Sequence, residues 1–281
     1  MTENNGKVWL ITGCSSGFGR CLTNAALKKG DRVIATARQP EQLQHFTQEY
    51  PDTVKTISLD VTDKEQVKTA VEFAKETFGR IDVLVNNAGY ALVAALEETS
   101  EEQMRQNFET NFFGAVNTIQ AVLPILREQK AGVIVNMSAI AGFVNKVGFS
   151  IYGATKFAIE GVSEALRGEV GPLGIKVIIV EPGPFRTDFI NRSLVKVEPQ
   201  NQDYAKTCGK FISVLENMEG KQPGDPDLAA EVIIQAVEAK KPPLRLVLGK
   251  YAYKTFRQKI KSLTMELDGW EETAANTDFE S

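Results

Sequence analysis

Histidine and cysteine are scarce in this chain. Its 281 residues include one histidine, His45, and three cysteines, Cys14, Cys21 and Cys208. With so few soft ligands, neither a zinc site nor a Ser-His-Asp triad is expected. The odd and sparse set of cysteines also argues against a disulfide framework, and it suits a reducing compartment.

Two further absences narrow the class of protein. No uninterrupted apolar run is long enough to span a bilayer, and the polar start Met1–Asn5 is typical of neither a signal peptide nor a transit peptide. The formal net charge of -4 provides no basic footprint for nucleic acid. We therefore expect no membrane span and no nucleic-acid partner, with the cytoplasm as the default location.

Short β-branched runs alternate with longer segments of helical period along the chain. Each run is typical of a buried parallel strand. The runs are Val8–Ile11, Arg32–Thr36, Val54–Ser58, Val83–Asn86, Val133–Asn136, Val177–Val180 and Leu244–Leu248. This rhythm predicts the α/β class: a doubly wound, parallel, seven-stranded sheet (Rossmann fold) with helices on both faces, in a single domain over residues 1–281.

Polar residues mark the starts of several predicted helices. Thr62 and Ser100 are each followed three residues later by Glu or Gln, which is the spacing of a capping box. Asp225 precedes a proline, as expected for an N-cap before the first helical position.

Two segments stand outside the alternating pattern. Residues 188–224 lack a strand signal, so we expect a long insertion with one or two helices that acts as a substrate lid. Residues 250–281 form a helical tail whose apolar side chains share one stripe. The stripe contains Tyr253, Phe256, Ile260, Leu263, Leu267 and Trp270, flanked by Lys250, Lys254, Arg257, Lys259 and Lys261.

The stripe of the tail predicts a helix that packs on the body of the protein or on a neighbouring subunit. A helix lying on a membrane surface is a weaker alternative, and the stripe is too short for an independent coiled coil. We expect a homo-oligomer, either a dimer or a tetramer.

The first predicted strand runs directly into a glycine-rich turn, Thr12–Gly19. Glycines permit a tight turn from strand to helix and a close approach of the backbone to phosphate. The start of the following helix offers free N–H groups and the positive end of the helix dipole. Because the motif follows a strand and opens a helix, it predicts a dinucleotide site.

Arginine follows the second strand, at Arg38, where NAD-preferring sites usually have an acid that binds the ribose 2′-hydroxyl. A guanidinium forms bidentate hydrogen bonds to phosphate oxygens and so suits a 2′-phosphate. Ala37 leaves room beside it, and Ser15 supplies another donor. The sequence therefore predicts NADP(H) as the cofactor in preference to NAD(H).

Tyr152 and Lys156 lie four residues apart, so they share one face of a predicted helix. An ammonium near a phenol lowers its pKa and makes proton exchange possible near neutral pH. Ser138 follows a strand and has a hydroxyl able to bond a substrate oxygen. Asn111 lies within the preceding long helical segment and is expected to bind water or backbone near the lysine.

Several motifs together resemble the short-chain dehydrogenase/reductase family, in its short single-domain branch that includes 17-beta-hydroxysteroid and retinol dehydrogenases. In family order they are Thr12-Gly13, Gly17, Gly19, Asn86-Asn87-Ala88-Gly89, Asn111, Ser138, Tyr152, Lys156 and Pro182-Gly183. The resemblance covers roughly residues 6–190. One departure is Phe18, which replaces the isoleucine that is usual in the family.

The resemblance implies a catalytic set and a cofactor-binding set. The catalytic residues would be Asn111, Ser138, Tyr152 and Lys156. The cofactor would contact Gly13, Ser15, Ser16, Gly17, Phe18, Gly19, Arg38, Asp60, Val61, Asn87, Ala88, Gly89, Tyr152, Lys156, Pro182, Gly183, Phe185 and Thr187. Within these sets, Asp60 and Val61 would meet the adenine, Thr187 the carboxamide, and Asn111 would support a water relay to Lys156.

The expected function is an NADP(H)-dependent oxidoreductase that interconverts a ketone or aldehyde and an alcohol, on a hydrophobic small molecule. The principal alternative is a non-catalytic NADP(H)-binding sensor or scaffold, although such proteins commonly lose the Tyr or the Lys. An epimerase or dehydratase of the longer sugar-nucleotide branch fits less well, because its glycine spacing differs. The physiological substrate, the direction of reaction and its stereochemistry stay open.

Overall fold

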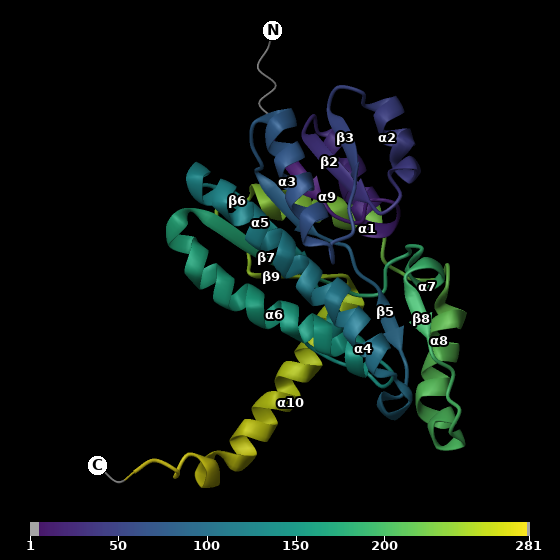
Figure 1. The fold of residues 1–281 in the computed structure, drawn as a ribbon. Helices are drawn as coiled ribbons and strands as arrows, with labels where there is room; N and C mark the ends of the chain where they lie inside the picture. Colours follow the sequence, from purple (N-terminus) through teal and green to yellow (C-terminus); the bar gives the residue numbers. More distant parts are fainter. Residues whose placement is uncertain (1–5, 280–281) are drawn as a thin grey trace.

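A parallel sheet of seven strands, covered by helices on both faces, forms the body of the protein (Figure 1). The computed structural model describes residues 6–279. Across the sheet the strands lie in the order β3 (Val54–Ser58), β2 (Arg32–Ala37), β1 (Val8–Ile11), β4 (Val83–Asn86), β6 (Gly132–Met137), β7 (Ile175–Pro182) and β9 (Arg245–Leu248). All seven predicted strands are confirmed, as is the doubly wound Rossmann fold.

Helices cover the sheet in two layers. One layer contains α1 (Gly17–Lys28), α2 (Gln44–Glu49) and α9 (Pro226–Glu238). The other contains α3 (Lys64–Phe78), α5 (Gly114–Gln129), which follows α4 (Glu101–Phe108), and α6 (Ser150–Val170). Successive residues of one strand serve opposite layers: Trp9 and Ile11 pack with α1 and α9, whereas Leu10 packs with α3 and α5. Burial on both faces explains why the central strands β1 and β4 are almost continuously apolar.

The start of α3 differs from the prediction. Asp63, not Thr62, is the N-cap, and its side chain accepts hydrogen bonds from the backbone N–H groups of Glu65 and Gln66. The Thr62 hydroxyl instead donates to Asp60 Oδ1 at 2.7 Å. A carboxylate is the stronger partner for free N–H groups at the positive end of a helix.

The other two predicted helix starts are confirmed. Ser100 and Gln103 form a reciprocal capping box at the start of α4. Asp225 caps α9 by accepting from the backbone N–H groups of Asp227 and Leu228.

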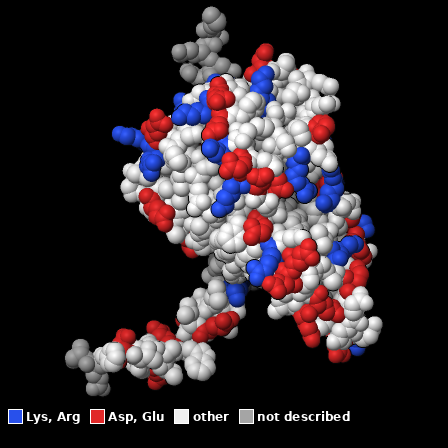
Figure 2. All heavy atoms as spheres, viewed as in Figure 1, with Lys and Arg blue, Asp and Glu red and all other residues white. Residues whose placement is uncertain are grey.

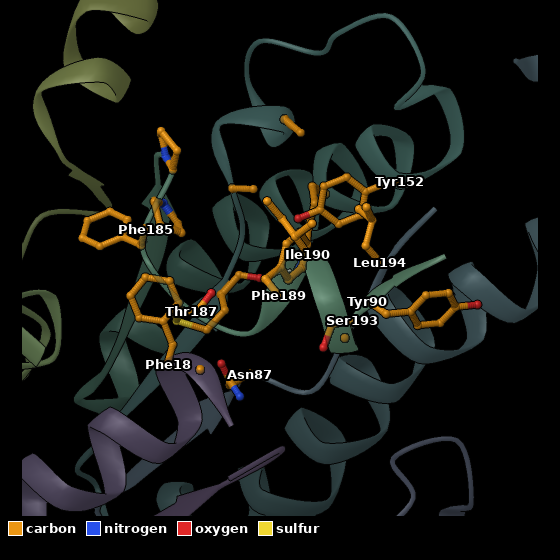
Figure 3. A pocket seen from close by; sticks show the side chains of 18 of the residues that line it. Phe18, Asn87, Tyr90, Tyr152, Phe185, Thr187, Phe189, Ile190, Ser193 and Leu194 are labelled. Carbon is orange, nitrogen blue, oxygen red and sulfur yellow. Dashed lines mark hydrogen bonds between the residues drawn. The ribbon is translucent and has the colours of Figure 1, made fainter. Parts of the chain in front are cut away.

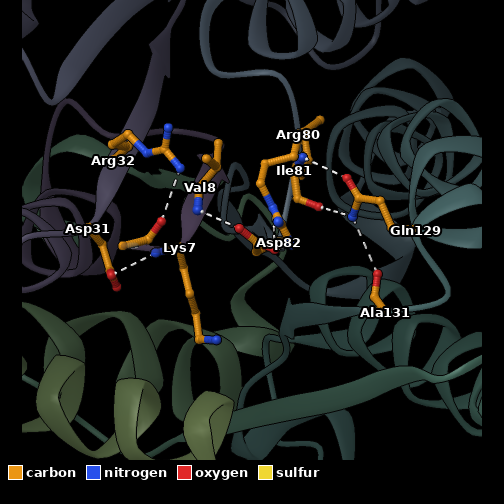
Figure 4. Close-up of polar contacts among 10 residues, drawn as sticks. Lys7, Val8, Asp31, Arg32, Arg80, Ile81, Asp82, Gln129 and Ala131 are labelled. Carbon is orange, nitrogen blue, oxygen red and sulfur yellow. Dashed lines mark hydrogen bonds and ion pairs between the residues drawn. The ribbon is translucent and has the colours of Figure 1, made fainter. Parts of the chain in front are cut away.

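Two carboxylates hold β1 at its amino end (Figure 4). Asp31, which is 2% exposed, accepts from the Lys7 amide and from Trp9 Nε1, both at 2.9 Å. Asp82 accepts from the Val8 amide, also at 2.9 Å. These contacts close the amino end of β1. Ligands bind to such sheets at the opposite end, beyond the carboxyl ends of the strands.

The segment 188–224 contains a strand that the sequence pattern did not predict. β8 (Leu194–Lys196) pairs in parallel with β5 (Ala91–Val93), a second short strand outside the main sheet. The expected helices are present as α7 (Phe189–Arg192) and α8 (Lys210–Met218). A strand of three residues is too short for its alternation to be recognised, so the expectation of no strand was wrong.

The tail forms one long helix, α10 (Lys250–Ala274), which leaves the body and points away from it (Figure 1). Its first turns pack well: Ala252 is fully buried, and the ring of Phe256 stacks on Phe143 with centroids 4.6 Å apart. The rest of the predicted stripe is largely exposed, as at Leu267 (72%) and Trp270 (69%). Packing on the body is therefore confirmed only for the start of the tail.

Candidate active site

A cavity of about 850 Å³ opens at the carboxyl ends of the central strands. Its walls come from the turn after β1, the end of β6, the start of α6, the loop after β7, and α8. It lies where the strand order reverses between β1 and β4, the point at which open α/β sheets bind ligands. Figure 3 shows Tyr152 with Ile190 and Leu194 on one side of it, and Phe18 with Phe185 and Thr187 on the other.

The glycine turn after β1 is packed against the end of β4. Gly13 has a φ of +71°, and a Cβ at this residue would lie 3.0 Å from Ala88 Cα. A Cβ at Gly19 would lie only 2.3 Å from the Gly13 carbonyl oxygen. Gly19 is buried and does not line the cavity, so it permits the close contact between turn and helix without facing a ligand.

Thr12 ties this turn to the next strand. Its hydroxyl oxygen accepts hydrogen bonds from the backbone amides of Asn87 and Ala88, both at 2.9 Å. Asn87 Nδ2 in turn donates to the carbonyl oxygens of Thr12 (2.9 Å) and Gly13 (3.0 Å). These bonds leave the backbone of residues 87–89 facing the cavity beside the glycine turn.

Phe18 contributes more than backbone to the cavity. Its ring meets that of Phe185 edge to face, with centroids 5.2 Å apart (Figure 3). The two rings come from distant parts of the sequence, one from α1 and one from the loop after β7. The larger residue at this position is thus accommodated by an aromatic partner.

Arg38, Asp60 and Val61 line the same cavity at the end nearest β2 and β3. Arg38 is exposed, while the preceding Ala37 is buried. No salt bridge joins the Arg38 guanidinium to a carboxylate within residues 6–279. A positive charge without a carboxylate partner is therefore available at this end of the cavity.

Ser138, Tyr152 and Lys156 all line the cavity, and all three are buried. The Ser138 hydroxyl has no partner at full hydrogen-bonding geometry among the residues that the structure describes, although its proximity to the Glu160 carboxyl partly offsets the rise that burial causes in that group's pKa. Lys156 Nζ donates to the Met137 carbonyl oxygen at 2.7 Å and lies 5.8 Å from the centre of the Tyr152 ring.

Asn111 lies beside this group and does not line the cavity. It occupies a π-helical turn, Glu109–Phe113, which interrupts the predicted continuous helix between α4 and α5. Its Nδ2 donates to the Tyr90 carbonyl oxygen (2.8 Å) and to Thr155 Oγ1 (3.1 Å), and its Oδ1 accepts from the Tyr90 amide (2.9 Å). Asn111 thus connects the loop after β4 with α6, next to Lys156.

Burial dominates the protonation of the central pair. It lowers the pKa of Lys156 to about 8, although the nearby Glu160 carboxyl partly opposes this change. Burial also raises the pKa of Tyr152 above its ordinary value. The expected lowering of the phenol pKa by the ammonium is not seen in this arrangement, where loss of water from the phenolate causes the change.

A buried cluster of charged groups behind Ser138 was missed from the sequence. Glu160 and Glu181 are 5% and 0% exposed, and Arg245 Nε lies 3.2 Å from Glu160 Oε2 and 3.6 Å from Glu181 Oε1. A Cβ at Gly142 would lie 2.3 Å from Ser138 Oγ and 3.0 Å from Glu160 Oε1, so serine and carboxylate border the same glycine.

Two carboxyls share one guanidinium in this cluster, and burial raises the pKa of both. For Glu181 the value reaches about 8, since the charge of Glu160 adds to the effect of burial. One signal was readable: Glu160 follows Lys156 by four residues and so continues the face of α6 that carries Tyr152. The position of Arg245 on β9 carried no comparable signal.

The chain is similar to a protein family and to individual relatives. The model of the short chain dehydrogenase family matches residues 7–196. The oxidoreductase BOA17 of Botryotinia fuckeliana is 40% identical over 95% of this chain and 97% of its own length. A 3-ketodihydrosphingosine reductase of Bacteroides thetaiotaomicron is 39% identical over 86% of this chain and 88% of its own length.

Solved structures agree with these relatives. A short-chain dehydrogenase from Streptomyces avermitilis is 44% identical and superposes with a TM-score of 0.92, covering 99% of this chain and 100% of that one. A serine dehydrogenase complexed with NADP+ is 28% identical with a TM-score of 0.75, covering 86% of this chain and 94% of that one.

Other kinds of site find little support in the part of the chain that the structure describes. No group of His, Cys, Asp and Glu side chains within residues 6–279 has the arrangement of a metal site. No described helix is both long enough and apolar enough to cross a membrane.

The raised pKa of Glu181 predicts how stability depends on pH. Between its ordinary value of 4.5 and about 8, the folded chain keeps a proton that the unfolded chain has released, so the free energy of unfolding falls as pH rises through this window. Glu181→Gln should remove this fall. Compared at about pH 5 and about pH 8, the wild type should lose at least about 1 kcal/mol more than the variant.

Urea unfolding at several pH values measures this difference. Glu164→Gln is the matched control, because Glu164 also pairs with Arg245 but is 55% exposed. An equally steep fall in the wild type and in Glu181→Gln would show that Glu181 does not retain the proton.

Proposed function

Because this chain belongs to the short-chain dehydrogenase family, we propose that it is an NADP(H)-dependent oxidoreductase that interconverts a carbonyl group and an alcohol. The observation that supports this most strongly is the shared cavity. Ser138, Tyr152 and Lys156 line the same hollow as the glycine turn and Arg38. Residues suited to a dinucleotide and residues suited to proton transfer therefore face one space.

The residues around the cavity fit a nicotinamide dinucleotide. Gly13 and Gly17, with φ of +71° and +54°, form a cradle that side chains would fill or strain, at the amino end of α1. The backbone of Asn87–Gly89 and the side chain of Thr187 would hold the remainder. When bound, the nicotinamide supplies or accepts a hydride.

The chain's own residues would handle the proton. In the reducing direction, the Tyr152 hydroxyl gives its proton to the forming alkoxide, and in oxidation it takes the proton back. The unpartnered Ser138 hydroxyl donates a hydrogen bond to the substrate oxygen and stabilises its charge. Lys156, with a pKa of about 8, is mostly protonated at neutral pH and supplies positive charge beside the phenol.

Asn111 has a supporting role in this proposal. By holding the Tyr90 backbone and Thr155, it fixes the loop after β4 against α6 beside Lys156. We propose that this arrangement maintains the path by which water and Lys156 return a proton to Tyr152.

The choice of NADP(H) over NAD(H) rests on Arg38. Its guanidinium is exposed at the cavity end near β2 and has no carboxylate partner among residues 6–279, so a 2′-phosphate is a suitable ligand. The serine dehydrogenase with a similar structure was solved with NADP+.

The substrate that we propose is a hydrophobic small molecule. The wall opposite the glycine turn is apolar and includes Phe149, Phe189, Ile190, Leu194, Phe211 and Leu215. Five of these six belong to α7, β8 or α8, so residues 188–224 are proposed as the lid. The name of the Bacteroides relative, a ketone reductase acting on a sphingoid base, agrees with this chemistry.

Two further parts of the proposal concern the setting of the enzyme. We place it in the cytoplasm, where its free cysteines suit reducing conditions, and we propose that it forms a homo-oligomer. The alternative function is a non-catalytic NADP(H) sensor or scaffold, and it differs from the enzyme in requiring no proton donor at Tyr152.

Replacement of the proposed proton donor tests catalysis directly. Tyr152→Phe should reduce turnover of carbonyl substrates with NADPH by about 10²- to 10⁴-fold, because general acid catalysis contributes on that scale. The loss of nicotinamide absorbance measures turnover across a panel of hydrophobic ketones and aldehydes, and the quenching of intrinsic fluorescence measures NADPH binding.

The expected result is a loss of turnover with NADPH binding retained. Tyr90→Phe is the control, because this tyrosine also lines the cavity but its ring points away from Tyr152 (Figure 3). Undiminished turnover in Tyr152→Phe would contradict its role as acid. A wild type that binds NADPH but reduces no member of the panel would favour the sensor.

Reversal of charge at Arg38 tests cofactor choice. Arg38→Asp should weaken NADPH binding by roughly tenfold to hundredfold, since hydrogen bonds to charged groups contribute about 1.5–3 kcal/mol. NADH binding should be equal or tighter, because the new carboxylate suits a ribose hydroxyl. Titration of both cofactors into Arg38→Asp and into Arg127→Asp, an exposed arginine far from the cavity, gives the comparison. An unchanged ratio of the NADPH and NADH dissociation constants in Arg38→Asp would refute the role of Arg38 in binding the 2′-phosphate.

A further inference from the structure

The outer part of α10 presents an apolar stripe that nothing in the described chain covers. Ile260, Leu267 and Trp270 are 53%, 72% and 69% exposed, and they lie beyond Phe256, the last buried residue of the helix. Large apolar side chains in a row on a projecting helix are unfavourable in water and typically mark an interface.

Charge on α10 is divided between its two halves. The amino-terminal half is basic, with Lys250, Lys254, Arg257, Lys259 and Lys261, and it contains no acidic residue. The carboxyl-terminal half is acidic, with Glu266, Asp268, Glu271 and Glu272, and it contains no basic residue. Figure 2 shows the acidic side chains along the outer part of the projecting helix. Two copies of this helix in antiparallel orientation are therefore complementary in charge.

We propose that α10 pairs antiparallel with α10 of a second copy of this chain, through residues 257–272. Two identical surfaces related by a twofold axis meet in such a pair. The two stripes would cover each other, and the basic half of each helix would face the acidic half of the other. Pairing about Met265, for example, brings Ile260 of one copy opposite Trp270 of the other, and it brings Lys259 opposite Glu271.

The charge pattern selects this arrangement over its alternatives. A parallel pair would place basic half against basic half and acidic half against acidic half, which costs energy at both ends. An anionic membrane would attract Lys259 and Lys261 but repel the acidic outer half, where the most exposed apolar residues, Leu267 and Trp270, also lie. The antiparallel pair buries the apolar stripe and also places each charged half beside a half of opposite charge.

The dimensions are suitable for a two-body assembly. The projecting part, residues 257–274, is about 27 Å long at 1.5 Å per residue. In an antiparallel pair the two bodies lie at opposite ends of the paired helices, so they do not collide. Tyr251 in the first turn of α10 lines the cavity, and its hydroxyl accepts a hydrogen bond from Lys146 Nζ at 2.9 Å. Each cavity would therefore lie beside one end of the paired helices.

This inference deepens the proposed self-association and is independent of the proposed reaction. The experiment uses two full-length variants with opposite charge reversals. One is Lys259→Glu with Lys261→Glu, which makes the outer tail acidic. The other is Glu266→Lys with Asp268→Lys, which extends its basic half. Sedimentation velocity at low ionic strength, where charge effects are least screened, measures the mass of each variant alone and of an equimolar mixture.

We expect a dimeric wild type, two variants that are each monomeric, and a dimer that returns when the variants are mixed. In the mixture every reversed charge again faces its opposite, whereas each variant alone places like charges together. Recovery on mixing excludes simple misfolding, because a damaged chain would not regain its partner. The double variant Lys240→Glu with Lys241→Glu changes two exposed lysines of the body by the same charge and should stay dimeric.

Several results would overturn the pairing. They are a monomeric wild type, single variants that remain dimeric, or a mixture that fails to associate. In a further variant, Leu267→Asp, the dimer should be lost at high salt as well as at low salt, because the change removes apolar burial. Turnover of carbonyl substrates is measured in the same samples, so failure of the proposed reaction is seen separately from failure of the pairing.

Discussion

The junction between the ends of β1 and β4 is the constraint on which the rest of the site depends. Thr12 accepts two amide hydrogen bonds from Asn87 and Ala88, and Asn87 returns two bonds to the carbonyls of Thr12 and Gly13. The backbones meet so closely that only glycine fits at Gly13 and Gly19. Because the ends of both strands are fixed here, the start of α1 and the loop after β4 face one cavity.

Burial gives the deep end of that cavity its chemistry. Lys156 is held by the Met137 carbonyl and kept from water, which brings its pKa to about 8, into a range useful for proton exchange. Glu160, Glu181 and Arg245 continue this buried charged region behind Ser138. Ser138 therefore borders a carboxyl whose pKa is raised by burial, and its surroundings are more polar than those of a serine at the end of an apolar strand.

Two segments lie outside the seven-stranded sheet and the helices that cover it. The segment 188–224 adds a small sheet and α8, and thereby closes the apolar side of the cavity. The tail adds a helix whose first turns belong to the body and whose remainder does not. The charge division of that helix, basic then acidic, matches a second copy of itself better than any surface of one sign.

Local patterns were enough to predict the main sheet and the glycine turn, because strand burial, glycine turns and helical spacing are properties of neighbouring residues. They also pointed to Ser138, Tyr152 and Lys156, which line one cavity in the structure. Helix capping by Asp63, the strand β8 and the π-helical turn at Asn111 depend on competition or pairing between segments, and the sequence alone did not reveal them. Only the tertiary structure brought Arg245 to Glu160 and Glu181, and only it determined that burial raises the pKa of Tyr152. Desolvation and long-range ion pairing arise from how distant segments pack, and no short stretch of sequence specifies them.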